Sequence, residues 1–182
     1  MKTISQVSLE GRRVLIRVDF NVPLDESLKI VDDSRIIAVL PTIKKVINDG
    51  GMAIIMSHLG RPENGFEERF SLKHIVKHLS VLLEKPVTFS ENCIGGKTAS
   101  DVAKMNNGDV IVLENLRFYS EEKNGDEGFA KELAALQIFM LMMLLEQFIG
   151  IMLQLLLLQN FSQTRNILGN SLVGRSVHWK GR

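Results

Sequence analysis

Several side chains able to bind a small anion stand where the apolar runs of this sequence end. They are Asp19 and Asn21 after the first run, Arg35 shortly beyond it, His58, Gly60 and Arg61 after the second run, and Asn115 and Arg117 after the fourth. Arginine forks bind carboxylate or phosphate through paired hydrogen bonds, while Asp and Asn can bind hydroxyl groups. Each arginine taken alone is better explained as a solvated loop charge than as a ligand-binding residue. Their repetition at successive run ends indicates a ligand that is small, anionic and hydroxylated.

The elements that must position these side chains alternate along the chain. Strands are predicted from β-branched and apolar runs, and helices from apolar residues at helical spacing. The predicted strands are 14–19, 53–57, 86–89 and 110–113, and the predicted helices are 35–48, 71–84, 97–105 and 126–136. Such alternation predicts an α/β fold with a parallel sheet covered by helices. In these sheets ligands bind beyond the carboxyl ends of the strands, so the side chains above are expected to converge there.

Three other patterns carry less weight. The run Gly95-Gly96-Lys97-Thr98 looks like the end of a phosphate-binding loop, but Glu91 stands where that loop needs a glycine. We therefore expect a helix start there and no nucleotide site. His74 and His78 lie one helical turn apart without a Glu between them, so we expect surface histidines and no metal site. His58 has the chemistry of a general base, but no Ser or Cys nucleophile stands out beside it.

The composition limits the class of protein. The net charge is +1, whereas a nucleic-acid-binding protein usually carries a strongly basic patch. The only cysteine is Cys93, so the chain cannot form an internal disulfide. No apolar run opens the chain, so we expect a cytoplasmic protein without a signal peptide. The composition then changes after Leu136. Residues 1–136 hold 18 basic and 20 acidic side chains, whereas residues 137–182 hold four basic side chains and one acidic side chain. We call residues 137–182 the tail.

Four motifs identify the first part of the chain by resemblance. They are RVDFNVP at 17–23, DDSRI at 32–36, SHLGRP at 57–62 and LENLRF at 113–118. Their order and spacing resemble those of phosphoglycerate kinase, a monomeric glycolytic family that transfers a phosphoryl group between ATP and 3-phosphoglycerate. The family has two Rossmann-like domains. The resemblance implies that residues 1–136 are an incomplete N-terminal, substrate-binding domain, and that the C-terminal domain for Mg-ATP is absent.

The resemblance also implies roles for individual residues. Asp19, Phe20 and Asn21 resemble the turn that contacts the substrate. Arg35 resembles the catalytic arginine that stabilises charge on the transferring phosphoryl group. The rest of the substrate-binding basic patch corresponds to His58, Leu59, Gly60, Arg61 and Arg117. The ligand expected from the residues alone, small, anionic and hydroxylated, agrees with 3-phosphoglycerate.

The tail departs from the family. Residues 138–158 are apolar except at Glu146, Gln147, Gly150 and Gln154. This run is long enough to span a bilayer. A Glu near the middle of a span costs about 2.5–3.5 kcal/mol if Asp is the guide, and no Trp or Tyr flanks the run. We therefore disfavour a membrane anchor. Because Leu and Met favour helix, we expect an apolar helical tail without a native domain, which promotes aggregation.

A shift of reading frame explains the tail better. One G placed before plausible codons for residue 137 onward changes the reading to ADIYVNDAFGTVHRDHAS. This reading supplies the strand and the His-Arg pair that the family resemblance predicts next. The first two bases of most codons are fixed by the residues present, so an accidental fit is hard to credit. The favoured hypothesis is a truncated, frame-shifted phosphoglycerate kinase that is inactive alone. The alternatives are a soluble phosphoglycerate-binding remnant and a membrane-anchored, non-enzymatic domain.

Overall fold

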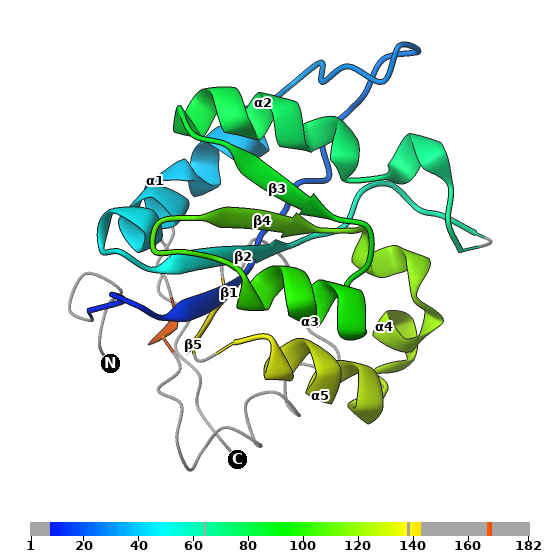
Figure 1. Cartoon of the computed structure of the whole chain (residues 1–182). Helices are drawn as coiled ribbons and strands as arrows, with labels where there is room; N and C mark the ends of the chain where they lie inside the picture. Colours follow the sequence, from blue (N-terminus) through cyan, green and yellow to red (C-terminus); the bar gives the residue numbers. More distant parts are fainter. Residues whose placement is uncertain (1–7, 64, 138, 143–166, 169–182) are drawn as a thin grey trace, which may run out of the picture.

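The computed structural model describes residues 8–63, 65–137, 139–142 and 167–168 (Figure 1). Within these residues six parallel strands form one sheet in the order β3-β4-β2-β1-β5-β6. The strands are β1 Arg13–Arg17, β2 Met52–Met56, β3 Val87–Ser90, β4 Val110–Leu113, β5 Phe139–Met142 and β6 Ile167–Leu168. The order places β4, β2 and β1 side by side, so the segments that follow these three strands leave the same edge of the sheet as neighbours.

Helices cover both faces of the sheet (Figure 1). One face carries α1 and α2, and the other carries α3 and α5. The α-helices are α1 Ser34–Asn48, α2 Lys73–Leu83, α3 Gly96–Ala103, α4 Ser120–Asn124 and α5 Glu127–Ala135, and short 3-10 turns span η2 Glu68–Phe70 and η3 Leu116–Phe118. The prediction of an α/β fold with a helix-covered parallel sheet is confirmed, and the four predicted strands lie within two residues of their expected bounds.

The apolar strands follow from this double coverage. Successive side chains of a strand point to opposite faces, so a strand with helices on both sides must be apolar throughout. In β1, Val14 and Ile16 join the core beneath α1 and α2, whereas Leu15 joins the core beneath α3 and α5. All three side chains are fully buried. Two apolar cores, one on each face, therefore hold the sheet in place.

The tail contributes strands where we expected helix. Backbone pairs run from Val14 with Phe139 to Arg17 with Met142, and β6 pairs with β5 in turn. The helical expectation is therefore wrong for residues 139–142 and 167–168. Helix propensity is a weak prior, and the free edge of β1 offers unpaired N–H and C=O groups that favour strand. The rest of the tail, including residues 143–158 of the apolar run, lies outside the described residues.

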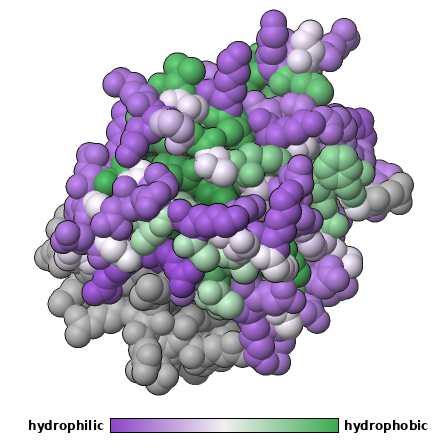
Figure 2. Space-filling model, in the orientation of Figure 1, coloured by the Kyte–Doolittle hydropathy of each residue, from purple (hydrophilic) through white to green (hydrophobic). Residues whose placement is uncertain are grey.

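Polar side chains cover most of the face of the molecule seen in Figure 2, with apolar side chains reaching the surface in places. Among the described residues, the large apolar side chains that remain exposed are Val31, Ile37, Phe66 and Val81. No helix in the described part of the chain is long and apolar enough to cross a membrane.

Candidate functional site

The three neighbouring strands β1, β2 and β4 deliver the predicted site residues to one edge of the sheet. The turn after β1 carries Asp19 and Asn21, and the turn after β2 carries the segment 58–61. Arg117 follows β4 within η3, and Arg35 lies in the first turn of α1. We call these residues the rim: Asp19, Asn21, Arg35, His58, Gly60, Arg61 and Arg117.

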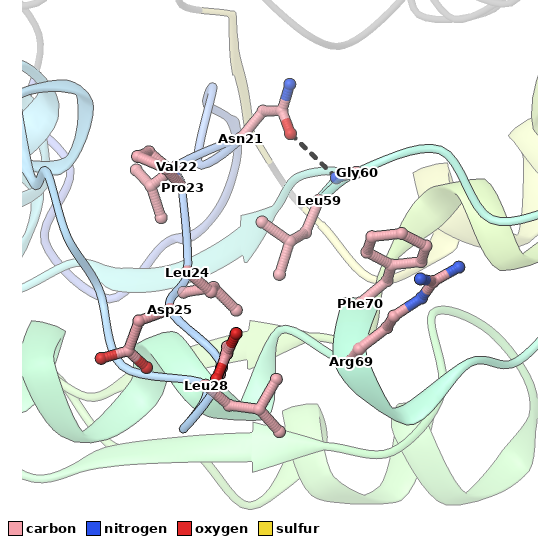
Figure 3. Close-up of a pocket in the computed structure, with 11 residues that line it drawn as sticks. Asn21, Val22, Pro23, Leu24, Asp25, Leu28, Leu59, Gly60, Arg69 and Phe70 are labelled. Carbon is pink, nitrogen blue, oxygen red and sulfur yellow. Dashed lines mark hydrogen bonds between the residues drawn. The ribbon is translucent and has the colours of Figure 1, made fainter.

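A series of hydrogen bonds links most of the rim. Arg35 forms an ion pair with the Asp19 carboxylate through Nη1, and the backbone N–H of Asn21 donates to Asp19 Oδ1 at 3.0 Å. The N–H of Gly60 donates to Asn21 Oδ1 at 2.8 Å, as the dashed line in Figure 3 marks. Arg117 then donates from Nη1 to the Gly60 carbonyl at 3.0 Å. The series brings together residues that lie up to about a hundred positions apart in the sequence.

The arginines of the rim remain accessible while they are held. The Arg35 side chain is 52% exposed despite its ion pair, and Arg61 is also exposed. Arg117 is half-buried, with one guanidinium nitrogen bonded to the Gly60 carbonyl. Each guanidinium carries five N–H donors, so capacity remains for an anion. The rim therefore presents positive charge and several directed donors toward solvent.

His58 adds no positive charge to the rim at neutral pH. Burial lowers the pKa of His58 to about 4, and the positive charges of Arg117 and Arg17 act in the same direction, against opposing effects of Asp19 and Glu122. A neutral imidazole can donate one hydrogen bond and accept another. The positive charge of this edge therefore comes from its arginines.

Two of the residues carried over by resemblance have side chains inside the core. Phe20 is fully buried and Leu59 is 2% exposed. The backbone N–H of Phe20 donates to Ser57 Oγ at 2.9 Å, and Ser57 Oγ donates to the carbonyl of Val18 at 2.9 Å. The side chains of Phe20 and Leu59 thus anchor the two turns that carry the rim.

Asn115 lies behind the rim. We expected its amide to be available for a ligand hydroxyl, but the residue is fully buried. Its Nδ2 donates to the carbonyls of Leu59 at 2.7 Å and Phe70 at 2.9 Å, and its Oδ1 accepts from the N–H of Arg117 at 3.0 Å. Both donors are therefore used within the protein, which explains why the expectation is wrong.

Two long-range interactions near the rim have no counterpart in the sequence motifs. Arg17, at the end of β1, forms an ion pair with Glu122 of α4 at 2.9 Å. Glu114 is buried after β4 and accepts from Ser71 Oγ at 2.8 Å and from the N–H of Leu72 at 2.9 Å. The partners lie 42 or more positions apart, so no local spacing reveals them. The sequence offers one hint of these interactions, which is the acidic residue Glu114 directly after the apolar strand β4.

A cavity of about 550 Å³ adjoins the rim (Figure 3). The loop 21–26 and Leu28 line one side, and Leu59, Gly60, Arg69 and Phe70 line the other. The Asn21–Gly60 hydrogen bond joins the two sides of the cavity. Its walls are mainly apolar, so it differs in character from the arginine-rich edge beside it.

The residues of the weaker patterns have partners within the protein. Lys97 forms an ion pair with Glu91, and α3 begins at Gly96 as expected for a helix start. His78 Nε2 lies 2.7 Å from Asp33 Oδ2, and His74 Nε2 lies 2.8 Å from the Glu68 carbonyl. Across the described residues, no group of three or more His, Cys, Asp or Glu side chains could hold a metal ion.

Comparison with known proteins decides the family. The family model for phosphoglycerate kinase matches residues 4–141. The chain belongs to the phosphoglycerate kinase family. Phosphoglycerate kinases of Syntrophobacter fumaroxidans and Chlorobaculum tepidum are 52% identical over 136 residues and 53% identical over 135 residues. These alignments cover 75% and 74% of this chain, but 34% of each relative.

Solved structures agree with this phosphoglycerate kinase assignment. The Coxiella burnetii enzyme aligns with a TM-score of 0.67 and 35% identity, over 78% of this chain and 34% of that one. The Pyrococcus horikoshii enzyme aligns with a TM-score of 0.70 and 29% identity, over 78% and 36%. This chain therefore spans about a third of the length of the phosphoglycerate kinases it matches, and that third contains every rim residue.

Proposed function

We propose that the rim binds 3-phosphoglycerate. The observation that carries the proposal is the hydrogen-bonded series from Arg35 to Arg117, which holds three turns together while leaving arginine donors exposed. Carboxylate and phosphate oxygens are the acceptors that guanidinium groups bind best. Asp19 and Asn21 lie between the arginines in this series and offer partners for the substrate hydroxyl. Arg35 is the residue we assign to charge stabilisation on the transferring phosphoryl group.

A titration calorimetry experiment tests this binding proposal. The chain is titrated separately with 3-phosphoglycerate, with glycerate and with inorganic phosphate. We expect saturable one-to-one binding of 3-phosphoglycerate, with weaker binding of the other two because each lacks one of its anionic groups. Equal affinity for inorganic phosphate and 3-phosphoglycerate would overturn the proposal, because the rim would then bind any phosphate.

A pair of arginine variants locates the binding. Arg61→Gln removes a guanidinium from the rim, and we expect 3-phosphoglycerate affinity to fall about ten- to hundredfold, the effect of lost charge-assisted hydrogen bonds. Arg13→Gln makes the same change in net charge at the opposite end of β1, away from the rim. Its affinity should stay close to that of the wild type. Equal losses in both variants would show that overall charge, not the rim, governs binding.

We propose further that the 182-residue polypeptide does not catalyse phosphoryl transfer by itself. Transfer requires Mg-ATP held in line with the acceptor. In the family this is the task of the C-terminal domain, and the match ends at residue 141, a third of the way along the relatives. A coupled assay of ADP release with Mg-ATP and 3-phosphoglycerate should give the rate of the protein-free blank. Turnover that rises in proportion to the purified chain would contradict this.

The tail has a proposed origin in a changed reading frame. Residues 137–182 are then a phosphoglycerate kinase coding segment read one base out of register. Two observations support this: the family match ends at residue 141, and the composition changes after Leu136. The restored reading also puts Ile-Tyr-Val-Asn at the four positions of β5, a sequence well suited to a strand beside β1.

A further inference from the structure

We infer that Asn115 is a positioning residue, which sets the geometry of the rim without touching the ligand. The inference rests on the proposed binding of 3-phosphoglycerate at the rim. Asn115 is fully buried, so no solute reaches it. Its side chain nevertheless contacts each of the segments that deliver the β2 and β4 parts of the rim.

The first contact fixes the turn after β2. Asn115 Nδ2 donates to the Leu59 carbonyl at 2.7 Å, one peptide away from Gly60. Gly60 joins two parts of the rim series, because its N–H donates to Asn21 and its carbonyl accepts from the Arg117 guanidinium. A turn free to rotate at Leu59 would misalign both bonds.

The second contact fixes the segment that packs against this turn. The other Nδ2 hydrogen donates to the Phe70 carbonyl at 2.9 Å. The Phe70 ring lies directly against the Cα of Gly60, so closely that residue 60 has no room for a Cβ. Asn115 thus holds the two sides of the same contact, one through Leu59 and the other through Phe70.

The third contact fixes the arginine itself. Asn115 Oδ1 accepts from the backbone N–H of Arg117 at 3.0 Å. The guanidinium of Arg117 returns to the Gly60 carbonyl, which closes a ring of interactions from Asn115 through Leu59 and Gly60 to Arg117. Buried Glu114 supports the ring from below, since its Oε1 accepts from the N–H of Asn115 at 2.7 Å.

The identity of the side chain follows from these partners. The carbonyls of Leu59 and Phe70 each need an N–H donor, and the backbone N–H of Arg117 needs an acceptor. The side chain at position 115 must therefore supply two donors and one acceptor. An amide meets this demand, whereas a carboxylate supplies only acceptors when ionised and would stand beside the Glu114 carboxylate. An apolar residue of similar size fills the space but leaves the three backbone groups without their partner.

The test compares Asn115→Leu with a control that loses buried hydrogen bonds elsewhere. Thr98→Val keeps the shape of the side chain but loses the Oγ1 hydroxyl, which has the carbonyls of Asn92 and Ile94 and the Ser90 hydroxyl within hydrogen-bond distance. Thr98 lies near the start of α3, which supplies no rim residue. Both variants are expected to unfold at lower temperature than the wild type. Only Asn115→Leu should weaken 3-phosphoglycerate binding, on the order of tenfold, since misplaced donors lose charge-assisted bonds.

A second readout does not depend on the ligand. Amide hydrogen exchange at Gly60 should accelerate in Asn115→Leu and stay unchanged in Thr98→Val, although Gly60 forms no bond with Asn115. If Asn115→Leu fails to fold, Asn115→Ser, which is smaller and too short to reach both carbonyls, takes its place. A folded Asn115 variant with wild-type exchange at Gly60 and wild-type affinity overturns the inference. A wild type that does not bind 3-phosphoglycerate overturns the proposed function instead, and exchange at Gly60 then decides on Asn115 alone.

Discussion

Buried and exposed polar residues have separate tasks at the carboxyl end of the sheet. Ser57, Glu114 and Asn115 are buried, and each bonds to backbone or side-chain groups of a neighbouring segment. Arg35 and Arg61 are exposed and are the groups able to meet a ligand. A buried polar group must satisfy its hydrogen bonds within the protein, which makes it rigid and suited to positioning. Ligand contact and positioning therefore fall to different residues.

At the residue scale, the neutral state of His58 makes stability depend on pH. The pKa of His58 is about 4 in the folded chain, below the 6.5 of an unfolded histidine, so the unfolded chain binds more protons between these values. The free energy of unfolding should therefore fall as pH drops from about 6.5 to about 4. Urea denaturation across this range should show a smaller fall in His58→Gln. Identical curves for the two proteins would contradict a buried, neutral His58.

Gly60 offers a second prediction at this scale. Its φ is +63°, and a Cβ would overlap the Phe70 ring, so Gly60→Ala combines backbone strain with a clash. We expect a loss of about 2–4 kcal/mol in the free energy of unfolding. Gly65, with φ of +79° and open space around it, is the matched control. Gly65→Ala should cost only about 1 kcal/mol, from strain alone. Equal losses by urea denaturation would mean that the Phe70 contact has no role.

At the scale of elements, β1 is the strand on which the site depends most. It pairs with β2 on one side and with β5 on the other, and the turn after it carries Asp19 and Asn21. The strand β5 comes from the tail, so residues that we attribute to a shifted frame support β1. Pairing of this kind uses backbone groups, which every residue except proline provides. A sequence not selected for the fold can therefore still occupy the strand position.

Proline substitution tests the role of β5. Leu141 pairs with Ile16 of β1. Leu141→Pro removes a backbone N–H from the middle of the strand, and we expect it to lower the free energy of unfolding by about 1–3 kcal/mol. Leu141→Val keeps the N–H and introduces a β-branched side chain that suits a strand, so its free energy of unfolding should stay within about 0.5 kcal/mol of the wild type. A proline variant as stable as the valine variant would mean that β5 does not support β1 in solution.

The sequence predicts elements better than it predicts contacts between them. The runs at 14–19 and 110–113 are recognisable as strands because their apolar pattern is local. The parallel sheet then follows from their alternation with helices, and the convergence of Asp19, Arg35 and Arg117 follows from the sheet. The Arg17–Glu122 ion pair and the burial of Asn115 depend on tertiary packing across many positions, which no local pattern encodes. The pairing of β5 was missed for the same reason.

At the scale of the whole molecule, the chain joins two unlike parts. Residues 4–141 match the phosphoglycerate kinase family and contain the whole rim, whereas the tail begins with a run rich in Leu and Met. The rim and its buried supports lie within the matched part. We therefore expect this chain to bind 3-phosphoglycerate, and we propose that it does so without catalysing phosphoryl transfer.

The nucleotide sequence from the codon for Lys131 onward tests this central claim most directly. We predict that the frame shifted by one base after Leu136 encodes Ala-Asp-Ile-Tyr-Val-Asn-Asp-Ala-Phe-Gly and continues, without a stop codon, into further phosphoglycerate kinase sequence. An additional G found on resequencing would make the product a full-length enzyme. Third bases that break this reading, or early stop codons in the shifted frame, would contradict the account and make the tail a sequence in its own right.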